Sequence, residues 1–62
     1  MSIRMAAIED LEDRILDMVE LMRALFPNFN SIPPAEKVIV GLNQIYRDTG
    51  KLADAIDKGW IE

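Results

Sequence analysis

The first part of the chain carries an unbroken apolar repeat with helical spacing. Six apolar residues follow one another at alternating separations of three and four positions: Ile8, Leu11, Ile15, Met18, Met22 and Leu25. No glycine or proline interrupts residues 2–26. This heptad pattern is typical of a helix that packs along one stripe on another helix. We therefore predict a helix over about residues 2–26, with Ser2 as its N-terminal cap, and call these six residues the predicted stripe.

The apolar arc of this helix is wider than the predicted stripe. At about 100° per residue, Val19 and Phe26 lie on one side of it and Leu21 lies on the other. A wide arc needs more than one neighbouring helix. We expect the predicted stripe to pack partly on the rest of the chain and to serve partly as a surface for self-association.

Prolines and glycines divide the remainder of the chain. Pro27 ends the first helix, and residues 27–33 form a loop in which Phe29 and Ile32 turn toward the core. Pro33 and Pro34 suit the first turn of a second helix, predicted over about residues 34–48. Gly50 is expected to end that helix, and a short third helix is predicted over about residues 50–58. Gly59 would end the third helix, with Trp60 folded back on its last turn.

These elements predict an all-α fold within a single domain of 62 residues. A long N-terminal helix packs against an antiparallel second helix, and the short third helix completes a helical hairpin or three-helix bundle. A chain of this length buries a small core, and oligomerisation is one of the usual remedies. We therefore expect a homo-oligomer, with a dimer paired through the first helices as the favoured form.

Composition removes most kinds of chemistry. The chain has no cysteine and no histidine, so it lacks disulfides, a thiol nucleophile, the commonest metal ligand and the commonest general base. No glycine-rich loop is present that could hold a phosphate. We expect no catalytic residue, no metal site and no cofactor, and hence a protein that is not an enzyme.

Charge and hydropathy restrict the partners. The 11 acidic residues outnumber the 7 basic ones, for a net charge of −4, which disfavours nucleic acid and anionic membranes. No apolar segment is long enough to cross a membrane. Glu9 and Asp10 interrupt the N-terminal apolar segment before it reaches the length of a signal-peptide core. The expected location is cytoplasmic, and nucleic-acid association is kept only as a less favoured alternative.

One face of the first helix concentrates acidic side chains. Glu9, Asp13, Asp17 and Glu20, called the acidic stripe below, lie opposite the predicted stripe, and Leu16 lies among them. A solvated helix face is the simpler interpretation. The functional interpretation is a docking surface for a basic partner, with Leu16 as an apolar centre inside a charged rim.

Two functional classes remain open. The first is a homodimeric regulator or adaptor that binds and modulates another protein. The second is a purely structural subunit whose only partner is its own copy. A regulator should keep an apolar or strongly charged patch exposed after self-assembly, whereas a structural subunit should not.

Overall fold

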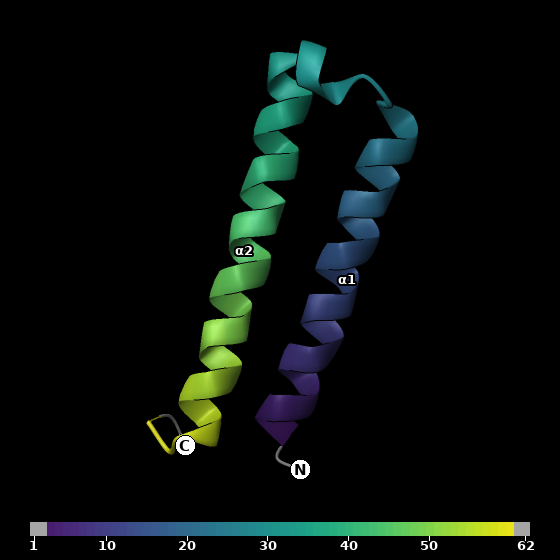
Figure 1. Cartoon of the computed structure of the whole chain (residues 1–62). Helices are drawn as coiled ribbons and strands as arrows, with labels where there is room; N and C mark the ends of the chain where they lie inside the picture. Colours follow the sequence, from purple (N-terminus) through teal and green to yellow (C-terminus); the bar gives the residue numbers. More distant parts are fainter. Residues whose placement is uncertain (1–2, 61–62) are drawn as a thin grey trace.

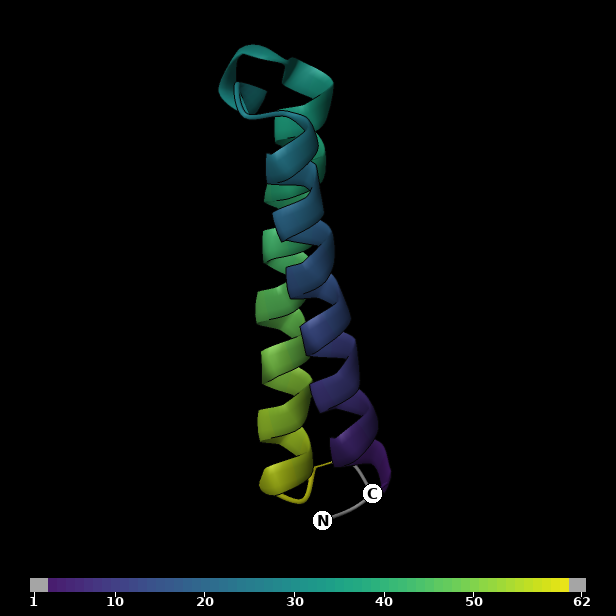
Figure 2. The same ribbon diagram turned by 90° about the vertical axis from the view of Figure 1, so that its right-hand side faces the viewer.

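The protein is an antiparallel hairpin of two long helices. A computed structural model describes residues 3–60. Helix α1 spans Ile3–Leu25, a single 3₁₀ turn η1 spans Phe29–Ser31, and helix α2 spans Pro33–Asp57. The two helices lie side by side, with the connecting loop at one end and the start of α1 and the end of α2 at the other (Figure 1). Seen edge-on they form one layer (Figure 2), and the Cα atoms extend over 42 × 16 × 10 Å. The hairpin therefore has two broad faces that no further element covers within the described residues.

The sequence explains where α1 ends. Leu25 is its last residue, and the backbone N–H of Phe26 still donates to the carbonyl of Met22. Pro27 then prevents continuation, as predicted. Phe29 and Ile32 are half-buried, which agrees with the expectation that they turn inward. The expected cap, Ser2, lies outside the described residues.

Helix α2 begins as the sequence predicts. Pro33 and Pro34 occupy its first turn, and Glu36 follows there, where a carboxylate suits the positive end of the helix dipole. Ile32 precedes them in an extended conformation, because the residue before a proline avoids helical dihedral angles.

The predicted end of the second helix at Gly50 is wrong. Helix α2 comprises 25 residues and continues through Gly50, so the separate third helix over residues 50–58 does not exist. Within the described part of the chain only Gly59 has a positive φ, and Gly50 therefore lacks the conformation of a helix-ending glycine.

Packing along α1 explains why the helix continues. Thr49 is only 4% exposed, and its Oγ1 donates to the carbonyl of Ile45 over 2.7 Å. Its hydroxyl is thus satisfied inside the helix, without the break that a threonine cap would make. Ala53 and Ile56 extend the half-buried surface beyond Gly50. Burial of this last part of α2 offsets the conformational cost of one internal glycine, about 1 kcal/mol.

The predicted end at Gly59 is confirmed in its backbone geometry. Gly59 has a φ of +80°, its N–H donates to Ile56, and the N–H of Trp60 donates to Ala55 over 2.8 Å. This pair of bonds is the Schellman motif. The side chain of Trp60 is 76% exposed, with the Lys58 ammonium 5.1 Å from its ring centroid. The backbone of Gly59 and Trp60 therefore caps the helix end, while the indole stays outside the core.

The core between the helices is small. Its buried apolar residues are Ile15, Val19, Ala35 and Ile39, and Thr49 is buried beside them. Ile39 is the largest side chain that is almost fully enclosed. Half-buried residues extend this line toward both ends of the hairpin. The chain alone thus encloses few side chains for its length.

Candidate protein-interaction surfaces

Only half of the predicted stripe faces α2. Ile15 is buried, and Ile8 and Met22 are half-buried. Leu11, Met18 and Leu25 are 45%, 51% and 61% exposed. The predicted stripe is therefore divided between packing on α2 and exposure to solvent, and self-association through the stripe stays a prediction.

A rotation of α1 explains the difference. Its buried and half-buried side chains include Glu12 and Val19 next to Ile8, Ile15 and Met22. These five also alternate separations of four and three, so two heptad stripes share the same three central residues. Helix α2 covers the stripe that contains Glu12 and Val19. The other stripe, with Leu11, Met18 and Leu25, points to the side.

Helix α2 has a matching exposed row. Val38, Ile45 and Leu52 recur every seven residues and are 47%, 51% and 47% exposed. This row is not apparent from the sequence when Gly50 is expected to end the helix, because Leu52 then belongs to a different element from the other two residues. Their seven-residue spacing across Gly50 was the signal that could have revealed it.

The two exposed rows lie on the same side of the hairpin. At about 100° per residue, each row lies roughly a quarter-turn around its helix from the side that packs on the other helix, and the direction of rotation is the same in both helices. Because the helices are antiparallel, the same rotation brings both rows to the same side of the hairpin. Shallow apolar grooves agree with this placement. One is lined by Ala7 and Ile8 together with Leu52, and another by Met22 and Phe26 together with Val38. We call this side the apolar face, defined by Leu11, Met18, Leu25, Val38, Ile45 and Leu52.

The acidic stripe lies away from the apolar face. Glu9, Asp13, Asp17 and Glu20 are all exposed, and Leu16 among them is exposed as well. Leu16 is 41% exposed and is separated from the apolar face by the contact line between the helices. The structure therefore keeps together the five residues that the sequence suggested for a partner, on a surface distinct from the apolar face.

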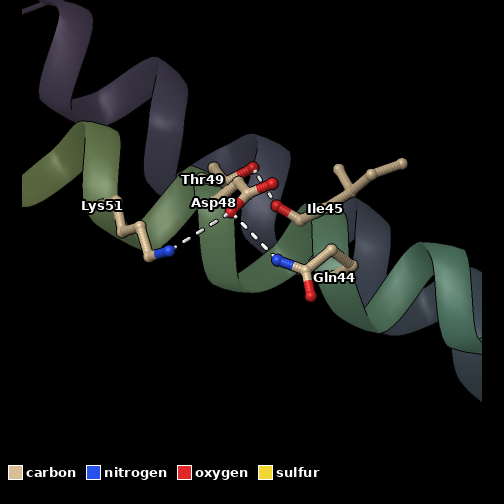
Figure 3. A network of polar contacts seen from close by, with 5 residues as sticks. All are labelled: Gln44, Ile45, Asp48, Thr49 and Lys51. Carbon is tan, nitrogen blue, oxygen red and sulfur yellow. Dashed lines mark hydrogen bonds and ion pairs between the residues drawn. The ribbon is translucent and has the colours of Figure 1, made fainter.

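Charged residues border the apolar face on both helices. On α1, Arg14 pairs with Asp10 at 3.1 Å, as their four-residue spacing suggests. On α2, Asp48 accepts a hydrogen bond from Gln44 at 3.1 Å and lies 3.7 Å from the Lys51 ammonium. Figure 3 shows these contacts around Asp48. All of these side chains are exposed, so their ion pairs contribute little to stability.

The exposed area is large for the mass of the chain. Its accessible surface is 4781 Å² for 7.0 kDa, whereas a compact monomer of that mass exposes about 4000 Å². The excess, about 700 Å², approaches the roughly 800 Å² that each partner buries in a standard interface. The excess area of the whole elongated chain is therefore of the size that an association interface covers.

Other kinds of site find no support in the described residues. Between residues 3 and 60, no group of three acidic side chains is arranged to hold a metal ion. Neither α1 nor α2 is long and apolar enough to cross a membrane. Comparison with protein families, with curated proteins and with solved structures finds no match. The surfaces themselves therefore carry the functional argument.

Proposed function

We propose that this chain is a non-enzymatic protein–protein interaction module that self-associates and binds another protein. The observation that carries the proposal is the separation of two surfaces on one thin hairpin. The apolar face exposes six large side chains, and the acidic stripe with Leu16 is exposed away from it. Self-association would use the first surface and leave the second accessible.

The apolar face supports self-association. Contiguous exposed apolar side chains of this extent are unusual on a stable monomer and mark association surfaces. The exposed half of the predicted stripe, Leu11, Met18 and Leu25, belongs to this face. Its position supports pairing that involves the first helix. Because few residues are buried within one copy, association would also add to the stability of the fold.

The acidic stripe supports a second, heterologous contact. Its four carboxylates have one sign and lie beside an exposed leucine, so an apolar contact at Leu16 would have an acidic border. A basic protein surface is the partner that this chemistry fits, and opposite charge would accelerate its association. This role corresponds to a regulator or adaptor.

A photo-crosslinking experiment tests the proposal. A photoreactive amino acid is placed at Leu16 in one variant and at Ile45 in another, and the products are identified from cells that contain the protein. The proposal expects a foreign protein at position 16 and the chain's own copy at position 45. The same foreign protein should bind less after Leu16→Ala or after Asp13→Asn with Asp17→Asn.

The outcome also separates the two functional classes. Crosslinks to the chain's own copy at position 45, with none to another protein at position 16, would indicate a structural assembly subunit. Absence of crosslinks at both positions would contradict both classes.

A further inference from the structure

We propose that a second copy of the chain covers the entire apolar face, and that the two hairpins pair with their loops at the same end. Helix α1 of each copy then lies against α2 of the other, which makes a four-helix bundle. The inference rests on the proposed self-association and deepens it, because it assigns both helices to the interface and specifies the orientation.

The register within one hairpin places the two exposed rows at matching heights. Ile8 lies level with Leu52 and Ile56, and Met22 lies level with Ala35 and Val38. Between these levels, a Cβ on Gly50 would lie 4.0 Å from the Glu12 carboxylate.

These levels bring the apolar face into three layers. Leu11 lies within about one helical turn of the height of Leu52, as does Met18 of Ile45, and Leu25 of Val38. A two-fold axis along the hairpin preserves these heights. Each layer would then receive the same two side chains from both copies, as the layers of a four-helix bundle require.

The charge of each helix favours one of the two possible orientations. Helix α1 has six acidic residues and three arginines, whereas α2 has four acidic and three basic residues. With the loops at opposite ends, α1 would lie against α1 of the other copy, so the two most acidic helices would be neighbours. With the loops at the same end, each α1 lies between two α2 helices, which reduces repulsion between like charges.

Arg14 and Asp48 make the same orientation specific. Both border the apolar face, on α1 and α2 respectively, and the register places them at nearly the same height. Within one hairpin they lie on opposite outer edges. In the proposed dimer, Arg14 of one copy comes beside Asp48 of the other, twice by symmetry. Opposite charges that flank a helical seam are the usual determinants of partner orientation.

A second copy fits the apolar face better than a different occupant. Among the described residues, the only charged one that lines either groove on this face is Arg4, at the end of the hairpin away from the loop. The two rows have the same number of residues and the same seven-residue spacing. Such a surface is complementary to itself under a two-fold axis. The excess area per chain, about 700 Å², is also close to what each partner of a stable dimer buries.

The first test measures mass against concentration by light scattering and sedimentation equilibrium. The wild type should approach twice its 7.0 kDa. Met18→Lys and Ile45→Lys should weaken the dimer at least about 100-fold, because each places two unpaired charges in the interface. Val40→Lys is a matched control, since its side chain is 60% exposed and is not on the apolar face; this variant should dimerise normally. A folded wild type that stays at 7.0 kDa would overturn the inference together with the proposed self-association.

The second test does not depend on variants that endanger folding. Arg14→Glu and Asp48→Lys change exposed side chains, and each alone should weaken its homodimer about 3- to 10-fold by placing like charges together. Mixing the two variants restores opposite charges across both contacts. Native mass spectrometry should then find more heterodimer than random pairing produces. Each variant chain has the same internal contacts in its homodimer and in the heterodimer. Any effect of a substitution on the stability of its own hairpin therefore cancels when the two kinds of dimer are compared.

The mixing result separates the inference from the proposed function. An excess of heterodimer, together with weakening of both single-variant homodimers, supports pairing with the loops at the same end. With the loops at opposite ends, position 14 would face position 14, so a charge reversal would exchange one like-charged pair for another and leave the homodimer as stable as before. A random mixture of stable dimers overturns this orientation while leaving self-association intact, because Arg14 and Asp48 would not meet with the loops at opposite ends.

Discussion

Replacement of Gly50 by alanine tests whether α2 is continuous. In the interior of a helix, alanine is favoured over glycine by about 0.5–1 kcal/mol because it loses less conformational entropy on folding. The nearest atom to an added Cβ is the Glu12 carboxylate oxygen at 4.0 Å, and Gly50 does not have a positive φ. This distance is an ordinary van der Waals contact. We therefore expect Gly50→Ala to raise the free energy of unfolding by about 0.5–1 kcal/mol.

If the second helix instead ended at Gly50, Gly50→Ala would lower the free energy of unfolding. A helix-ending glycine has a left-handed conformation, in which alanine costs about 1–2 kcal/mol. Gly59 supplies the control for that case, because its φ is +80°; Gly59→Ala should lower stability by about 1 kcal/mol.

Urea unfolding followed by far-UV circular dichroism gives both values from the midpoint and slope. The variants are compared at one total chain concentration, since association shifts apparent stability. If Gly50→Ala and Gly59→Ala destabilise alike, the continuous α2 is refuted.

Four further changes test the core and the composition. Ile39→Ala should lower the free energy of unfolding by about 2–5 kcal/mol because it empties an enclosed site, whereas Val40→Ala, at a 60% exposed side chain, should change it little. Ile15→Asp should abolish folding measured by circular dichroism, since the carboxylate would be buried without a partner. Thr49→Val should change unfolding in urea by less than about 1 kcal/mol, because the Ile45 carbonyl keeps its helical partner. Chelator should leave the melting temperature unchanged, as expected without histidine or cysteine.

The helical class and the element ends at proline were predictable from local chemistry. Pro27 and Pro33 restrict their own and the preceding residues' dihedral angles, so their effect does not depend on the rest of the fold. Gly59 was predictable for a similar reason, because a glycine followed by the apolar Trp60 matches the last two positions of a Schellman motif. Gly50 has the same local preference, but Ala53 and Ile56 follow it and are half-buried against α1. Packing of these residues on α1 keeps α2 helical through Gly50, and a rule based only on neighbouring residues does not include such packing.

The acidic stripe was predictable as a group because helical spacing alone places its members on one side of α1. What the spacing could not provide was its relation to the other surface. That relation depends on which of two overlapping heptad stripes α2 covers. Both contain Ile8, Ile15 and Met22, so the pattern of apolar residues fits either one.

The two stripes differ in the residues that they contain besides Ile8, Ile15 and Met22. The covered stripe contains Glu12 and Val19, whereas the uncovered one contains Leu11, Met18 and Leu25. The more apolar stripe is thus the one left exposed within a single hairpin. Glu12 is only half-buried, close to Gly50, whose missing side chain leaves space beside the carboxylate. Burying Leu11, Met18 and Leu25 against a second copy would recover, at about 25 cal/mol per Å² of apolar surface, the stabilisation that the internal packing leaves unused. The wide apolar arc of α1 therefore contains two stripes, one that its own α2 covers and one that the proposed dimer would cover.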